Sequence, residues 1–446
     1  MLGLRELEFF LLVLSPLSIF TNLNQQSPTK PMAFKRILKI IFCFVIASLA
    51  IPLIKVIPMD YQQELAKIEY TALNEPNHSG SSLNDQKSLF NKAYYYFLKS
   101  SLTGNRQDME KGEVAFDKAL SNLPLSADLY LLHTAFNLKL HRLEAAKTDL
   151  EKLAFMDEDP KVQVLKADIA VQEGKYNAAA TSYRNIIEIN RDWDNLSRLA
   201  YLRAKFGDFE SADQLYHEAE EEISAKEMRS FAWVELQRGY LALSRGQYEA
   251  AWDHYQRADQ AYSGYWLTKE FMAEWLGTQR NFDPAIVLYK QVIACTQRPE
   301  LYHALGDLYL FMGNAELAKP WHDKALAVYL DSARRGEVQY YHHLASFYAD
   351  ARLDGAEAVK WAQKDIQLRK NVTTRDALAW ALFRDGQYPA AVDEMKKALS
   401  GNWQDAHLFF HAAMIYLAAG MTEEGKDFLQ KAFNINPYYD AFHVHR

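Results

Sequence analysis

The sequence predicts an all-α protein: a solenoid of about ten helix-turn-helix units, preceded by one transmembrane or signal helix. Small residues recur about every 34 residues over most of the chain, which is typical of helix pairs repeated in series. The 18 glycines and 13 prolines are few for 446 residues, and both residue types disfavour helix interiors. A long apolar run near the N-terminus predicts the preceding helix.

Composition excludes several classes of function. The 50 basic and 57 acidic residues give a net charge of −7, so no basic surplus points to nucleic acid. No basic patch interleaved with aromatic residues points to RNA or DNA either, and we expect no nucleic-acid partner. Only Cys43 and Cys295 are present, and Cys43 lies in the apolar run, which excludes a disulfide framework.

The apolar run covers Ile37–Ile57, and its only charges, Lys39 and Lys55, lie near its two ends. About 20 apolar residues span a bilayer, and lysines near the ends reach the headgroups. By the positive-inside rule, the basic residues before the run place the N-terminus in the cytoplasm and the chain after residue 60 outside it, which is the periplasm if the protein is bacterial. These basic residues are Lys30, Lys35, Arg36 and Lys39.

A cleaved signal peptide is the alternative interpretation of this run, with Ser48-Leu49-Ala50 as the small-residue cleavage site. The apolar run continues past Ala50 through Ile51, Leu53 and Ile54, which favours an uncleaved anchor. Cleavage would make the protein secreted. Both interpretations place the repeats outside the cytoplasm.

The chain then divides into four segments. Met32-Ala-Phe-Lys-Arg opens a better basic region than the start of the chain, so residues 1–31 are an extra leader or a misassigned start. Residues 32–60 form the anchor, residues 61–89 form a polar linker, and residues 90–446 form the solenoid. The linker is predicted from the polar stretch that begins at Asn74.

The repeat is visible in two sets of small residues. The first set lies about twelve residues before the second, and six turns also contain a glycine. Small residues let paired helices approach closely, and a glycine in the turn supplies the left-handed backbone at the helix end. The second set is Gly112, Ala146, Ala179, Ala212, Ala251, Ala285, Ala318, Ala358, Ala391 and Gly425.

This pattern resembles the tetratricopeptide repeat (TPR) superfamily, whose period is 34 residues. The best unit is Leu301-Tyr302-His303-Ala304-Leu305-Gly306-Asp307-Leu308-Tyr309, followed by Gly313, Ala318 and Ala325. The resemblance implies a right-handed superhelix whose first helices line a concave groove that binds partner polypeptides. Two intervals, of 39 and 40 residues, imply extra residues near 222–228 and 331–339. We expect each to lengthen a helix; the alternative is a projecting contact surface.

The resemblance places partner-binding residues on the first helices of the C-terminal units. Exposed aromatic and methionine side chains are suitable anchors for a bound segment, and burial in the core is the alternative for each of them. The groove-facing positions are His303, Asp307, Phe311, His342, Ser346, Ala349, Asp376, Trp380, Phe383, His407, Phe410 and Met414.

A metal site is the alternative use of the C-terminal histidines. His407 and His411 are four residues apart on a predicted helix and share one face, a spacing that can bind zinc or nickel. The zinc-protease pattern needs a glutamate after the first histidine, and Leu408 stands there instead. His342-His343 and His443-x-His445 would add ligands, but packed or solvated histidines are the simpler explanation for all of them.

Catalytic motifs are absent from the sequence. No Gly-x-Gly or Cys-x-x-Cys occurs, and we find no nucleophile–base signature. Residues 420–427 imitate a phosphate loop, but Asp427 replaces the hydroxyl residue that would bind magnesium. We therefore expect no enzyme and no cofactor. The leading hypothesis is a membrane-tethered, extracytoplasmic scaffold that binds a partner polypeptide, and the alternative is a metal-handling envelope protein.

Overall fold

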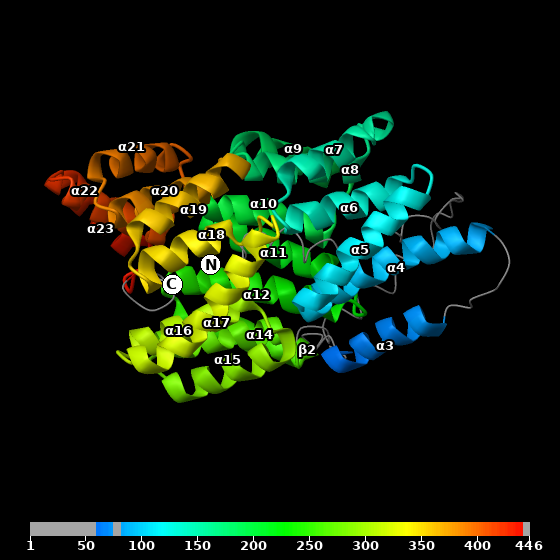
Figure 1. Cartoon of the computed structure of the whole chain (residues 1–446), viewed down its shortest axis with the longest axis horizontal. Helices are drawn as coiled ribbons and strands as arrows, with labels where there is room; N and C mark the ends of the chain where they lie inside the picture. Colours follow the sequence, from blue (N-terminus) through cyan, green and yellow to red (C-terminus); the bar gives the residue numbers. More distant parts are fainter. Residues whose placement is uncertain (1–58, 75–81, 440–446) are drawn as a thin grey trace, which may run out of the picture.

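The computed structural model describes residues 59–74 and 82–439, and these residues are almost entirely helical (Figure 1). From residue 82 onward the helices form ten successive antiparallel pairs, as the repeat predicts. The first five pairs are α4 (Ser82–Thr103) with α5 (Arg106–Asn122), α6 (Ala127–Lys139) with α7 (Leu143–Glu151), α8 (Pro160–Gln172) with α9 (Tyr176–Ile189), α10 (Trp193–Lys205) with α11 (Phe209–Glu222), and α12 (Met228–Ser244) with α13 (Tyr248–Ala261).

The other five pairs complete the array, and one of them contains a π-helical turn, η4 (Phe347–Ala351). A short 3₁₀ helix, η3 (Ala154–Met156), follows α7. The pairs are α14 (Trp266–Thr278) with α15 (Phe282–Thr296), α16 (Pro299–Phe311) with α17 (Ala315–Arg334), α18 (Tyr341–Ser346) and η4 with α19 (Gly355–Leu368), α20 (Val372–Arg384) with α21 (Tyr388–Leu399), and α22 (Ala406–Ala418) with α23 (Thr422–Ile435).

The recurring small residues lie where the helices of each pair cross, as predicted. Ala179, Ala212 and Ala251 of the second set are completely buried, and so are Thr134 and Ala200 of the first set. The contact is too close for a larger residue at some of these positions. A Cβ atom on Gly239 would lie 2.3 Å from the ring of Tyr255. The spacing in the sequence is therefore the spacing of helix–helix contacts.

Local signals define the helix ends. Asp192, Asn371 and Asp405 precede α10, α20 and α22, and each side chain accepts a hydrogen bond from a backbone N–H in the first helical turn. Gly174 and Gly207 follow α8 and α10 with positive φ angles of 76° and 81°, which a side chain with a Cβ rarely adopts. These caps start helices, and these glycines end them where the chain turns into the next helix.

The predicted polar linker over residues 61–89 is wrong for most of its length. Helix α3 (Tyr61–Asn74) and the start of α4 occupy it, and only residues 75–81 lie outside the described chain. The strand β1 (Met59–Asp60) pairs in parallel with β2 (Tyr262–Ser263), and Tyr262 Oη donates a hydrogen bond to Glu64 Oε2 at 2.5 Å. The polar stretch after Asn74 suggested a tether, but the residues on both sides of it are compatible with helices that dock on the array.

The array coils back on itself, so that units far apart in sequence are in direct contact. The backbone N–H of Gln404 donates to the carbonyl of Lys205 at 2.8 Å. The N–H of Val372 donates to Tyr176 Oη at 2.7 Å, about 200 residues away. Trp266 Nε1 likewise donates to the Leu102 carbonyl at 2.8 Å. We call this set of contacts the seam; the sequence did not predict it.

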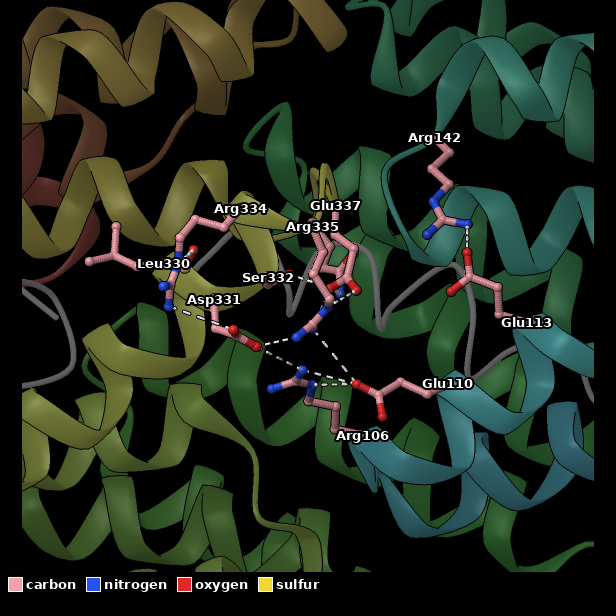
Figure 2. Close-up of polar contacts among 11 residues, drawn as sticks. Arg106, Glu110, Glu113, Arg142, Leu330, Asp331, Ser332, Arg334, Arg335 and Glu337 are labelled. Carbon is pink, nitrogen blue, oxygen red and sulfur yellow. Dashed lines mark hydrogen bonds and ion pairs between the residues drawn. The ribbon is translucent and has the colours of Figure 1, made fainter.

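The two long repeat intervals fall at helices that contact the N-terminal segment. Helix α17 has 20 residues, and near its end Asp331 lies 3.8 Å from Arg106 of α5. Arg335 lies 3.8 Å from Glu110, so the two segments face each other through paired charges (Figure 2). Arg229 at the start of α12 lies 3.6 Å from Glu64 of α3. The extra residues lengthen helices, as expected, and they also form a contact surface, directed at this chain itself.

Within residues 59–74 and 82–439, no helix combines the length and the apolar character that a membrane span requires. The Ile37–Ile57 run, the leader over residues 1–31, and His443 and His445 lie outside the described residues.

Candidate binding surface and histidine clusters

The predicted partner-binding residues lie on α16, α18 with η4, α20 and α22, and polar and ring contacts connect these helices in series. His303 of α16 packs on Phe347 of η4, with ring centroids 4.9 Å apart. Trp380 Nε1 of α20 donates to Asp350 Oδ1 of η4 at 3.0 Å. Asp376 of α20 and His411 of α22 form a hydrogen bond of 3.0 Å between Oδ1 and Nδ1. The first helices of the four C-terminal units therefore form one continuous face.

Burial divides these residues into two groups. His303, His342, Asp376 and Ala349 are buried, and His342 Nδ1 lies 3.5 Å from Asp365. We therefore no longer expect these side chains to anchor a partner. A second group remains partly or fully accessible to solvent. Its members are Asp307, Phe311, Ser346, Trp380, Phe383, His407, Phe410 and Met414.

The accessible aromatic residues gather on α20 and α22. The ring centroid of Trp380 lies 4.8 Å from that of Phe383 and 6.5 Å from that of Phe410. Tyr388, at the start of α21, lies 6.0 Å from Phe383 and is exposed. We call these four residues, Trp380, Phe383, Tyr388 and Phe410, the aromatic patch. Neighbouring aromatic side chains with part of each ring exposed can take up apolar side chains of another chain.

His407 and His411 come together as predicted, and Asp376 joins them. The ring centroids of the two histidines are 4.0 Å apart, and one candidate ligand atom from each of the three residues lies within 4.8 Å of the others. We call this group the α22 cluster. Burial, with the positive charge of Arg384 acting in the same direction, lowers the pKa of His411 to about 3, although Asp405 raises it. The neutral imidazole that metal binding requires is therefore favoured.

The sequence did not reveal Asp376 as a partner of this histidine pair. The aspartate lies 35 residues before His411, one repeat earlier in the chain. It occupies a groove-facing position in its own unit, and the stacking of units brings it beside the histidines. The repeat period contained this information, because residues one period apart on first helices are neighbours.

A further histidine cluster lies between α16 and α17, and we call it the α16 cluster. Asp307 accepts a contact from His322 Nε2 at 2.9 Å and lies 3.5 Å from His303 Nε2. Both histidines are buried, and Asp307 is partly exposed. His303 and Asp307 were predicted to face the groove. His322 was not predicted, because it lies on the second helix of the unit and the groove was expected to be lined by first helices.

One of the middle units carries a buried network of charges on its first helix, α10. Arg198 of α10 is completely buried, with its Nε 2.9 Å from Asp168 and its Nη1 2.5 Å from Asp194. Burial opposes the charged guanidinium, but these two carboxylates raise the pKa of Arg198 well above its ordinary value. Arg198 and its two carboxylates therefore form a charged network that is buried from solvent.

The family model of the tetratricopeptide repeat matches residues 160–192, 299–331 and 406–439. These segments coincide with the α8–α9, α16–α17 and α22–α23 pairs, so the predicted TPR repeats are confirmed there. A comparison with curated protein sequences finds no match.

The comparison with solved structures matches this chain over most of its length to two further proteins. The APC/C hetero-tetramer Cut9-Hcn1 is 18% identical over 84% of this chain and 79% of that chain, with a TM-score of 0.42. A human IFIT1 dimer with PPP-AAAA is 15% identical over 84% of this chain and 86% of that chain, also with a TM-score of 0.42.

Proposed function

We propose that this chain is a membrane-tethered, extracytoplasmic scaffold whose TPR array binds a polypeptide segment of a partner protein. The observation that carries the proposal is the aromatic patch, three of whose four residues lie on the first helices α20 and α22 of consecutive C-terminal units. In a TPR array these helices line the concave side, where partners dock. Binding at such a surface requires no catalytic group and no cofactor, and we propose none for it.

The tether is the part of the proposal that depends on the Ile37–Ile57 run and the basic residues before it. The strand β1 begins two residues after Ile57 and is paired with β2 of the array. This pairing supports a short connection between anchor and array in place of a long flexible linker. The array would then stand close to the membrane, on its extracytoplasmic side.

Capture by the solubilised full-length chain tests the scaffold function. We expect the wild-type chain to recover one or two defined polypeptides from cross-linked membranes. Trp380→Ala and Phe410→Ala should each weaken recovery while circular dichroism remains helical. Phe155→Ala is the matched control, since Phe155 lies on η3, away from the patch, and is 67% exposed.

Two outcomes would contradict this function. Equal recovery by the wild-type chain and both patch variants would exclude the aromatic patch as the docking surface. Recovery that disappears after nuclease treatment would identify a nucleic acid as the partner, in place of the protein that we propose.

Metal handling is the second candidate function, and the position of Asp376 beside His407 and His411 favours it. Two imidazoles and one carboxylate suit zinc or nickel, and His407 is accessible to solvent. Calorimetric titration of the full-length chain with Zn²⁺ should give a binding event that His407→Gln removes. An unchanged titration for His407→Gln would exclude the α22 cluster.

A further inference from the structure

The α16 cluster has the geometry of a metal site that is independent of both functions proposed above. His303 Nε2 and His322 Nε2 both point at the carboxylate of Asp307, at 3.5 Å and 2.9 Å. In a tetrahedral site with metal–donor distances of about 2.0–2.1 Å, donor atoms lie about 3.3 Å apart. The observed separations bracket this value, so an ion can be accommodated with small side-chain movements.

The fold holds both imidazole rings in place. His322 packs against the backbone of α16 at Gly306, where an added Cβ would lie 2.1 Å from the His322 ring. Phe347 packs on both rings, with centroids 4.9 Å from His303 and 5.4 Å from His322. Metal ligands are most effective when the surrounding side chains fix their orientation in this way.

The next unit covers the cluster. Phe347 belongs to the π-helical turn η4, and such turns are frequent at functional sites. Asp307 is partly exposed, so a water molecule can reach the cluster and supply the fourth ligand.

We propose that His303, Asp307 and His322 bind a divalent transition metal of the zinc class. Two imidazole nitrogens are borderline ligands that suit Zn²⁺, Co²⁺ and Ni²⁺ better than Mg²⁺ or Ca²⁺, and a carboxylate oxygen is compatible with such a site. The ion connects α16 to α17 and stiffens the unit that contacts η4. The site is structural, because the two histidines are buried and Phe347 covers them.

Cobalt titration of the full-length chain tests this site separately from the α22 cluster. A His407→Gln, His411→Gln double variant removes the imidazoles of the α22 cluster. We expect this variant to bind one equivalent of Co²⁺, with the visible absorption of tetrahedral cobalt. Adding His322→Gln should weaken binding by about 100-fold or more, because one of three protein ligands is lost.

A second substitution covers the case in which His322→Gln does not fold. Asp307→Asn, on the surface side of the cluster, should also weaken Co²⁺ binding, while circular dichroism shows an intact helical chain. Zn²⁺ should raise the Tm of the double variant and should not raise that of Asp307→Asn in the same background.

The proposal is overturned if the double variant binds no Co²⁺, or if it binds Co²⁺ equally well with and without His322. The scaffold function is unaffected by either result, because partner capture through Trp380 and Phe410 does not involve these ligands. A metal that binds only the wild-type chain would favour the α22 cluster alone.

Discussion

Helices α10 and α22 are both first helices of TPR-like units, yet α10 is almost completely buried and α22 is partly exposed. Every residue of α10 from Trp193 to Leu202 is buried. Helix α22 leaves His407, Phe410 and Met414 partly exposed. In Figure 1 the C-terminal helices α20–α23 gather at one end of the molecule, away from α3 and α4. The same repeat unit is therefore buried to different extents at different positions in the array.

The seam accounts for part of the burial of α10. Trp403, in the turn before α22, packs on Tyr201 and Tyr176, with ring centroids 6.5 Å and 5.1 Å apart. Lys205 at the end of α10 lies 4.8 Å from the Trp403 ring and 3.3 Å from Asp405. These contacts bury the end of α10 against the start of the α22 unit. The comparison teaches that the seam covers the start of α22, whereas side chains farther along that helix stay partly exposed.

The largest expected effect on stability comes from removing Arg198 from its buried ion pairs. Arg198→Met leaves Asp168 and Asp194 buried without their cation, which costs about 3–5 kcal/mol. Arg191→Met is the matched control, because Arg191 is 46% exposed while pairing with Glu218 and Glu222, and such surface pairs contribute about 1 kcal/mol or less. Thermal unfolding followed by circular dichroism measures both. Equal Tm values for the two variants would show that the Arg198 pairs add little.

Trp403→Ala should be nearly as costly, because it removes a buried ring from the seam. Truncation of a buried tryptophan costs about 3–5 kcal/mol. The change should also increase hydrogen exchange at the Gln404 amide, which donates to Lys205. If that amide exchanges no faster in the variant, the tryptophan does not hold the seam together.

Acid should destabilise the folded chain through buried neutral histidines, of which His141 is one. His141 is buried beside Arg369, and burial followed by that positive charge lowers its pKa well below 6.5. The folded state thus binds fewer protons than the unfolded state. The stabilisation is complete above pH 6.5 and falls by about 1.4 kcal/mol per pH unit below it, until the folded pKa is reached.

His141→Asn tests this pH dependence with little backbone strain. His141 has a φ angle of 58°, a left-handed conformation that asparagine tolerates. Between pH 6.5 and pH 5, the unfolding free energy of this variant should fall less steeply than that of the wild-type chain. Parallel pH profiles for the two proteins would exclude His141 as the titrating group.

Trp380→Ala should have the smallest effect on stability, about 1 kcal/mol, because the Trp380 side chain is only partly buried. Trp403→Ala should lower the free energy of unfolding in urea more than Trp380→Ala does. Trp380→Ala should weaken partner capture more than Trp403→Ala does. A loss of stability at Trp380 as large as that at Trp403 would mean that α20 is core after all.

The sequence predicted the contacts within units much better than the contacts between turns. Ala179 and Ala212 could be assigned to helix crossings because the same requirement for a small residue returns in each unit. Tyr176 and Trp403 could not be paired, because each seam contact occurs once and leaves no periodic signal. Asp376 and His322 were missed for a related reason. Each completes its cluster from a different helix, and spacing along a single helix does not reveal such a contact.

The helix α3 shows the opposite error. A polar stretch suggested a flexible linker over residues 61–89, yet Tyr61 is buried and Glu64 accepts a hydrogen bond from Tyr262. Tyr61, Leu65 and Ile68 follow one another at helical spacing and pack against the core, but the polar residues that follow Asn74 drew the interpretation toward a linker. Short polar segments beside a repeat array can therefore belong to the folded unit.

Site-specific photo-cross-linking tests the central claim, that the open C-terminal face binds a polypeptide, most directly. Benzoylphenylalanine replaces Phe383 of the aromatic patch in one chain and Phe433 of α23 in another, and Phe433 is 49% exposed but is not part of the patch. After irradiation in native membranes, we predict a protease-sensitive adduct of defined mass at position 383 and none at position 433. Adducts of equal yield at both positions, or none at position 383, would contradict the account.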